Sequence, residues 1–318
     1  MRINNLLKLA VGGLFAAATT FAAHDARSGG PAAPREVTPT GSGFAGVYGD
    51  LSADQAEGIS TPDHIKSAAA SGAPTLVWEA LEHGEKVECL DCIATVAPLL
   101  YDSNAKTREI AAWWLRRRVF GVFGVGEVYS QTIQALQSNP NPVYRAYAAY
   151  ALGEFFASPG IDACATAVMS DSDPGVRAAA ASALGRLNDD GAGALGKALG
   201  DSDSGVALAA LGSAVRINSF SGVSNVAALT RSTSTAEVRR RALEVLDALN
   251  VTDSVDVVAA VAKNDTDAGV RAEACHALGT FGDTTLHDAS AMTVLHNLST
   301  NDSDTFVRDQ AQIALQRL

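Results

Sequence analysis

Basic residues are scarce in this chain of 318 residues. It holds 24 Lys and Arg against 35 Asp and Glu, so its formal net charge at pH 7 is −11. Proteins bind nucleic-acid backbones mainly through Lys and Arg, whose contacts release counterions from the phosphates. An acidic chain repels those phosphates, and we therefore expect no nucleic acid partner.

Long apolar runs are also lacking. A permanent membrane span needs about 20 apolar residues. The main apolar run, at residues 9–18, is shorter than that. It follows a start that contains Arg2 and Lys8, and small residues lead from it to Ala23. This layout is typical of a cleaved secretory signal. We expect residues 1–23 to be a signal peptide, with an uncleaved anchor as the alternative. The mature protein would then be periplasmic or secreted, with no membrane span.

Motifs for catalysis are absent. The sequence has no nucleophile elbow, no HExxH zinc motif and no paired carboxylates in a supporting context. Ser and Asp are abundant, but nearly all stand where helix ends and turns need a side-chain oxygen. We expect no enzyme activity, no bound cofactor and no metal site.

Cysteine is rare, with four in the whole chain. Cys89 and Cys92 form the sharpest chemical feature, because a CxxC pair can close a disulfide, remain as paired thiols, or do redox or metal work. Ile93 stands where covalent haem attachment needs His, and a zinc site would need two more ligands. A structural role is the preferred interpretation. Cys164 and Cys275 are expected to be buried single thiols.

An internal repeat accounts for most of the chain. The segment 171–188 has the pattern of a capped helix, and its central Val176 has counterparts at steps of 30 to 37 residues, namely Thr107, Tyr144, Val206, Val238, Val270 and Val307. A good N-cap residue lies three positions before each of these anchors: Asn104, Asn141, Asp173, Asp203, Thr235, Asp267 and Asp304. Such self-similarity is typical of stacked two-helix repeats, and seven aligned caps predict seven helix starts.

The repeats predict an all-α fold, an α-solenoid of stacked antiparallel helix pairs. We expect about seven repeats and an N-terminal cap within residues 63–318. The first helices of the repeats are predicted at 87–100, 127–137, 160–169, 191–199, 221–230, 254–262 and 289–298. The preceding residues 24–62 are rich in Pro and Gly and have little apolar periodicity, which predicts a linker.

An arginine follows the anchor in six of the seven repeats, and Ala207 is the exception. This column could bind anions, but a ladder repeated in register is better explained as architecture, with the arginines paired to the acidic turns at Asp171, Asp201, Asp265 and Asp302. The structural column comprises Arg108, Arg145, Arg177, Arg239, Arg271 and Arg308.

The pattern Asp-x-Asp-Pro-x-Val-Arg-x-x-Ala-x-x-Ala-Leu-Gly resembles the short HEAT-like repeats first described in phycocyanobilin lyases. The resemblance covers residues 89–318 and implies the fold rather than an activity, because such repeats serve scaffolds, lyases and hydroxylases alike. The related deoxyhypusine hydroxylases carry His-Glu pairs, whereas none of the six histidines here precedes Glu. The resemblance therefore does not favour a di-iron enzyme.

Helical geometry points one stripe of each second helix toward the concave side of the predicted stack. Most positions on this stripe carry small residues, but the N-terminal repeats place Trp113 and Tyr150 on neighbouring helices. Aromatic and Arg side chains are the types that anchor interfaces. We therefore expect partner binding through Trp113, Arg117, Tyr150, Glu154 and Arg186. The alternative is that the two rings only cover the terminal core.

Residues 119–126 are apolar and Gly-rich, and we expect a loop that packs over the stack or offers Phe120 and Phe123 to a partner. The loop lacks the Lys-Ser/Thr of a phosphate-binding loop, so nucleotide binding is not expected.

The function expected from the sequence is that of a non-catalytic, exported scaffold that binds a protein or peptide along the concave face. Two alternatives remain. One is a thiol-redox or metal-binding accessory protein centred on Cys89 and Cys92, and the other is a lyase-like repeat module.

Overall fold

The computed structural model describes residues 61–118 and 126–318, which form α-helices and short 3-10 helices without any strand. The predicted all-α fold class is confirmed. The predicted signal peptide and nearly all of the predicted linker lie outside the described residues. The first described helix begins at Pro62, one residue before the predicted boundary, and Thr61 caps it. Within the described ranges, no helix is both long enough and apolar enough to cross a membrane.

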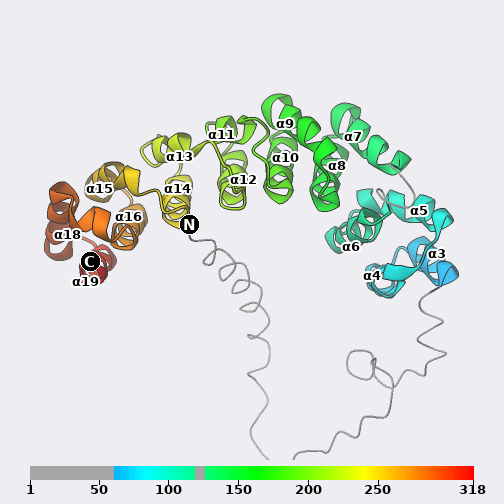
Figure 1. Cartoon of the computed structure of the whole chain (residues 1–318), viewed down its shortest axis with the longest axis horizontal. Helices are drawn as coiled ribbons and strands as arrows, with labels where there is room; N and C mark the ends of the chain where they lie inside the picture. Colours follow the sequence, from blue (N-terminus) through cyan, green and yellow to red (C-terminus); the bar gives the residue numbers. More distant parts are fainter. Residues whose placement is uncertain (1–60, 119–125) are drawn as a thin grey trace, which may run out of the picture. The chain divides into compact units, whose positions relative to one another are not determined.

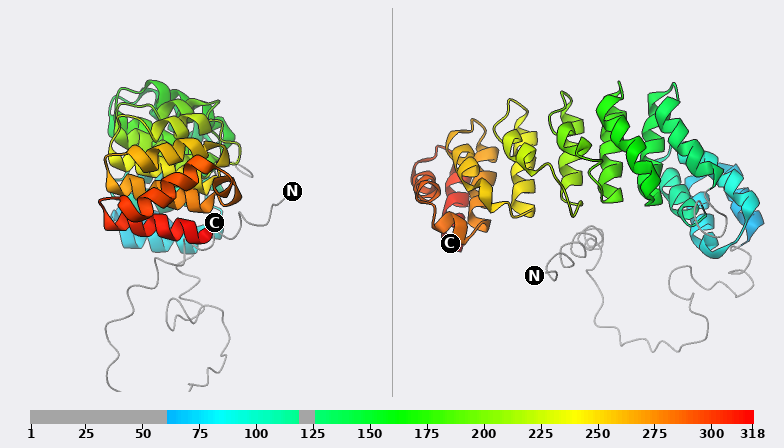
Figure 2. Two further views of the ribbon diagram at one scale, coloured as in Figure 1. Left: turned by 90° about the vertical axis from the view of Figure 1, so that its left-hand side faces the viewer. Right: turned by 45° about the horizontal axis from the view of Figure 1, so that its top comes forward.

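Helix pairs follow one another along the described part of the chain, which we term the repeat unit, and form two layers (Figures 1 and 2). The first-helix layer consists of α5 (Leu90–Val96) with η2 (Ala97–Tyr101), α7 (Glu127–Ser138), α9 (Ile161–Ser170), α11 (Ala194–Ala198), α13 (Val223–Leu229), α15 (Val255–Asn264) and α18 (Ala289–Asn301). The second-helix layer consists of α6 (Ala105–Arg116), α8 (Pro142–Phe155), α10 (Pro174–Leu187), α12 (Ser204–Ala214), α14 (Ala236–Ala248), α16 (Ala268–Thr280) and α19 (Thr305–Arg317). In Figure 1 the second-helix layer lines the inner side of the stack.

Several short elements complete the unit. The N-terminal pair is α3 (Pro62–Ser71) and α4 (Pro74–His83), followed by η1 (Gly84–Lys86). The remaining elements are η3 (Ser158–Gly160), η4 (Thr252–Ser254) and α17 (Asp283–Leu286).

Each second helix starts where the repeat pattern predicts. All seven predicted caps accept a hydrogen bond from a first-turn amide of their own helix. Each cap is worth about 0.5–2 kcal/mol. Pro142 and Pro174 occupy the first helical position, where proline needs no amide hydrogen bond. The seven helix starts are therefore encoded locally.

The first helices differ more from the predicted ranges. A single helix is predicted at 87–100, but Pro98 removes one amide donor, and the chain forms α5 followed by the 3-10 helix η2. The helix predicted at 191–199 begins only at Ala194, because Gly191, Ala192 and Gly193 all have positive φ. The short helix α17 was not predicted.

Three glycines set the closest contacts between second helices. They share one repeat position, nine residues after the anchor. A Cβ atom would lie 2.9 Å from the Ala183 Cα at Gly153, 2.8 Å from the Ser213 Cα at Gly185, and 2.8 Å from the Ala314 Cα at Gly279. No side chain fits at such distances, so these seams (α8/α10, α10/α12 and α16/α19) require glycine. The other seams carry Arg116, Val215 or Asp247 at this position.

Candidate partner-binding surface

The arginine column forms a ladder between neighbouring repeats. Four of its arginines hold the turn aspartate of the next repeat through Nε and Nη2, with donor–acceptor distances of 2.7–2.9 Å: Arg145–Asp171, Arg177–Asp201, Arg239–Asp265 and Arg271–Asp302. Their Nη1 atoms donate to carbonyls of their own turns. The side chains are 12–15% exposed for Arg and 5–13% for Asp. Most of the column is therefore engaged inside the protein.

The aspartates of the ladder also order their own turns. Each accepts a hydrogen bond of 2.9 Å from the amide two residues later. Hydrogen bonds from the arginines lower the pKa of Asp171, Asp201 and Asp302 below its ordinary value. These carboxylates therefore stay ionised and bind across the seam.

Two of the Arg–Asp pairs that would form the ladder are missing: one site lacks both the arginine and the aspartate, and the other lacks only the aspartate. Ala207 would face Thr233, which stands where the other turns have Asp. Arg108 would face Asn139, and its guanidinium instead lies 3.8 Å from the centroid of the Tyr147 ring. The loss of both partners at Ala207 and Thr233 supports a structural role for the column.

Cys89 and Cys92 are joined by a disulfide at the start of α5. The Cys89 Sγ also accepts from the Cys92 amide at 3.1 Å and so caps the helix. Both residues are buried, with 8% and 0% of their surface exposed. Cys164 and Cys275 are buried free thiols, and burial raises the pKa of each to about 12. Neither the disulfide nor the two free cysteines offer an accessible thiolate.

Three of the five predicted binding residues lie together on α8 and α10. Arg186 forms an ion pair with Glu154, and its guanidinium lies 5.7 Å from the centroid of the Tyr150 ring. Glu154 was predicted to face outward, but it is 7% exposed, because it lies beneath its partner. Burial and the neighbouring Glu154 carboxylate raise the pKa of Tyr150 to about 12. Its hydroxyl therefore stays protonated and can donate a hydrogen bond.

The other two predicted residues lie on and just after α6. Trp113 is half-buried and packs against the core. Arg117 is exposed and pairs with Glu85 at 3.1 Å, with both side chains about half exposed. An exposed pair of this kind contributes only about 0–1 kcal/mol, so Arg117 remains exchangeable with a ligand.

Sequence reasoning missed two residues at the same place. Phe156 ends α8 with 53% of its surface exposed and a φ of 51°. The Arg116 guanidinium lies 5.1 Å from the centroid of this ring. Together with the predicted residues they form what we term the arginine–aromatic patch: Trp113, Arg116, Arg117, Tyr150, Glu154, Phe156 and Arg186.

A signal for Phe156 exists in the repeat alignment. The position twelve residues after the anchor has positive φ in four repeats, where it is Phe156, Asn188, Asn250 and Gly282. Gly and Asn adopt this conformation readily, whereas a bulky side chain there is an outlier. Reading that column would have singled out Phe156.

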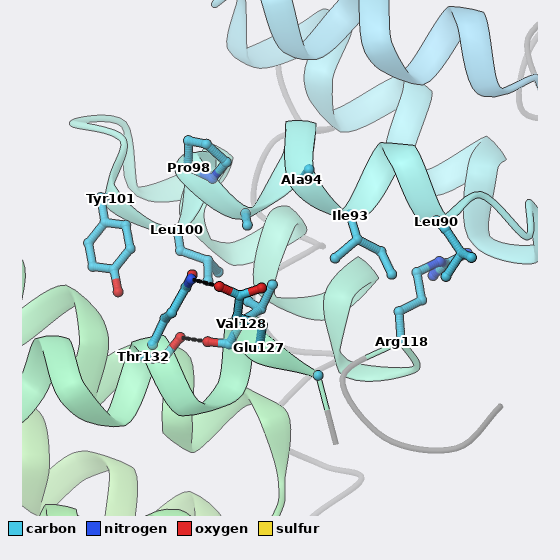
Figure 3. A pocket seen from close by; sticks show the side chains of 13 residues that line it. Leu90, Ile93, Ala94, Pro98, Leu100, Tyr101, Arg118, Glu127, Val128 and Thr132 are labelled. Atoms are coloured by element: carbon cyan, nitrogen blue, oxygen red, sulfur yellow. Dashed lines mark hydrogen bonds between the residues drawn. The ribbon is translucent and has the colours of Figure 1, made fainter. Parts of the chain in front are cut away.

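A hollow of 520 Å³ lies between α5, η2 and α7 and is lined mainly by apolar side chains (Figure 3). Arg118 borders it, but its guanidinium donates to four carbonyls, among them Gly84 and Val87, and lies 3.5 Å from the centroid of the Trp114 ring. Arg118 therefore links the end of α6 to η1 and to Val87. The Gly-rich segment with Phe120 and Phe123 lies outside the described residues.

The fold defines a class of protein, the α-helical repeat solenoids. The family model for HEAT repeats matches residues 129–216 and 223–316, more than half of the chain. The chain belongs to the HEAT repeat family. A search of curated proteins finds no match to the sequence.

Solved structures with the same fold are distant in sequence. The YIBA protein of E. coli is 18% identical, with a TM-score of 0.51 over 83% of this chain and 96% of that chain. Kap121p bound to Pho4p is 13% identical, with a TM-score of 0.57 over 84% of this chain and 34% of that chain. Human deoxyhypusine hydroxylase reaches a TM-score of only 0.35, at 18% identity over 82% of this chain and 96% of that chain. The first two likenesses concern the fold alone.

Proposed function

We propose that this protein is a non-catalytic scaffold that binds a protein or peptide on its second-helix layer, at the arginine–aromatic patch. The observation that carries the proposal is the gathering of half-buried and exposed aromatic rings with arginines on α6, α8 and α10. Trp, Tyr and Arg dominate the binding energy of protein interfaces, because they bury large areas and form directed polar contacts.

The stacked helices suit this task physically. Ala180 and Ala183 are fully buried between second helices, so neighbouring helices lie close and hold the patch residues in place. A preformed surface loses little conformational entropy on binding. Kap121p, a solenoid of similar fold, was solved bound to Pho4p, which supports the idea that such a stack can hold a protein.

The disulfide supports action outside the cytoplasm. Disulfides persist in oxidising compartments and are rare where thiols are kept reduced. We therefore propose that the protein is exported and works in the periplasm or in a secreted form.

Thiol chemistry is a weaker candidate for the function. Disulfide exchange needs a thiolate that can reach a sulfur atom, but Cys89 and Cys92 are buried and Cys92 has no exposed surface. The disulfide instead lies at the start of α5, where the Cys89 Sγ caps the helix. Thiol titration with and without reductant would separate the two functions, because a reactive thiol of low pKa would favour the redox role.

The test of the scaffold function is partner binding by matched variants. Full-length protein captures partners from the envelope fraction, and the affinity of each captured partner is then measured directly. The double variant Trp113→Ala/Tyr150→Ala should weaken binding by about tenfold or more. The control Arg240→Ala lies on the same layer at α14 and should bind as the wild type does. If the double variant binds the partner as tightly as Arg240→Ala and the wild type do, with helical content unchanged, the proposal is rejected.

A further inference from the structure

Phe156 stands out because phenylalanine is an unfavourable residue at a position that is both left-handed and exposed. Its φ of 51° places it in the left-handed region, where a side chain with a Cβ is strained. The repeats with Asn188, Asn250 and Gly282 have residues at this position that tolerate the turn. Burial does not compensate, since Phe156 is 53% exposed. Strain of this kind often marks a functional site.

The α6/α8 seam beside Phe156 is packed less closely than the neighbouring α8/α10 seam. Arg116 occupies the repeat position that is glycine at the closest seams, and the neighbouring ladder rung is also missing, because Arg108 faces Asn139. The α6/α8 seam therefore lacks both devices that draw second helices together. Arg116 instead extends over the Phe156 ring at 5.1 Å.

The charge at this seam lacks an internal partner. Within the described ranges, no carboxylate lies within ion-pair distance of Arg116, whereas Arg186 and Arg117 have Glu154 and Glu85. A guanidinium on an aromatic face keeps its donors free for a carboxylate, which it can bind through two parallel hydrogen bonds. The local charge is thus positive in a chain whose net charge is −11.

We propose that the α6/α8 seam binds a peptide segment of a partner protein that carries an Asp or Glu beside an apolar side chain. The carboxylate pairs with Arg116, and the apolar side chain packs on Phe156. This inference rests on the proposed scaffold function and adds the chemistry of the partner.

The experiment begins with a random-peptide phage library panned on the full-length protein. Enriched peptides should share an acidic residue next to an aromatic or aliphatic one. Their affinity is then measured by fluorescence polarisation for the wild type, Phe156→Asn and Arg116→Gln. Phe156→Asn should lose about tenfold in affinity or more, yet its melting temperature should be unchanged or higher, because Asn tolerates the left-handed turn. Phe306→Asn, which removes a phenylalanine that is 57% exposed on α19, is the matched control and should keep full affinity.

The acidic residue is tested in a cycle. Replacing it by its amide should weaken binding to the wild type by about tenfold, but should change binding to Arg116→Gln little. Enrichment of basic or uncharged peptides, full affinity of Phe156→Asn, or a lower melting temperature of that variant would overturn the inference. If one of these results is found but the enriched peptides bind Trp113→Ala/Tyr150→Ala more weakly than the wild type, the scaffold function stands and only the partner chemistry is wrong. If no peptide binds saturably, both fail.

Discussion

At the scale of single residues, the ladder shows how one side chain serves two elements. Arg177 holds the turn before its own helix through the Asp171 carbonyl and the next repeat through the Asp201 carboxylate. Both side chains are mostly buried, at 15% and 13% exposed. A pair of this kind contributes more than an exposed one, chiefly because removing one partner leaves the other charge buried and unpaired.

We therefore expect Asp201→Asn to lower the free energy of unfolding by about 1–3 kcal/mol. Asn keeps the side-chain oxygen that accepts from the Asp203 amide, so the loss reports on the ion pair. Urea denaturation followed by circular dichroism measures the change. The control Asp91→Asn breaks the exposed pair with Lys66 and should cost no more than about 0.5 kcal/mol. If both variants lose the same free energy of unfolding, the ladder pair stabilises the fold no more than an exposed ion pair does.

The same carboxylates predict how stability depends on pH. The arginine hydrogen bonds lower the pKa of Asp171, Asp201 and Asp302 in the folded state. The unfolded chain, with ordinary Asp pKa values of about 3.9, takes up protons first as pH falls. Their contribution is thus complete above the unfolded pKa and is lost as pH falls below about 4 toward the folded values. When melting temperatures are measured from pH 6 down to pH 2.5, they should decrease as pH drops below about 4. The decrease should be less steep in Asp201→Asn.

At the scale of elements, the distance between second helices depends on one repeat position. Gly153, Gly185 and Gly279 allow backbone contact at their seams, while larger residues at the same position keep other seams wider. Glycine usually weakens a helix, by about 1 kcal/mol relative to alanine. Here its absence of a Cβ permits packing that outweighs this cost.

Two glycine variants separate these effects. Gly185→Ala places a Cβ 2.6 Å from the Ser213 side chain and 2.8 Å from its Cα, so we expect a net loss of about 1–3 kcal/mol in stability. Gly212→Ala, on the next helix, meets nothing within 4 Å and should gain up to about 1 kcal/mol from helix propensity. Thermal unfolding of both variants measures the difference. A gain in both would mean that the seam can move apart without cost.

At the scale of the whole repeat unit, the seams between second helices are unequal. The seams α8/α10, α10/α12 and α16/α19 combine a contact glycine with a ladder pair, and α14/α16 has the pair alone. Two seams, α6/α8 and α12/α14, have neither. The first of these lies within the arginine–aromatic patch, which also extends to α10. The second lies near the break at residues 217–222 between the two stretches of matched repeats.

Completing the missing rung should strengthen the α12/α14 seam. In Ala207→Arg/Thr233→Asp the new pair copies the neighbouring rungs, and we expect a gain of up to about 1 kcal/mol. Hydrogen exchange of the amides in α12 and α14 should slow. Ala207→Arg alone adds an unpaired cation at a position only 3% exposed and should destabilise. If the double variant exchanges no more slowly than the wild type, the absent rung does not weaken this seam.

Most of the fold could be predicted from the sequence, because the signals that specify it are local. A cap lies within three residues of the amide that it accepts from, so Asp173 or Asp267 can be recognised without any neighbour. The ladder was predictable for a related reason. Its arginines and aspartates recur once per repeat, and stacking brings equal positions of successive repeats together.

The candidate site depended on the tertiary structure. Trp113 and Tyr150 could be placed on one layer from helical periodicity, but the burial of Glu154 beneath Arg186 follows from how closely α8 and α10 approach. The contact of Arg116 with the Phe156 ring likewise depends on how α6 and α8 pack against each other. Helix starts and repeated positions could be read from short stretches of chain, since each depends on residues close together in sequence. Which seams close and which stay open follows instead from the packing of the folded chain, because it depends on side chains that meet from different repeats.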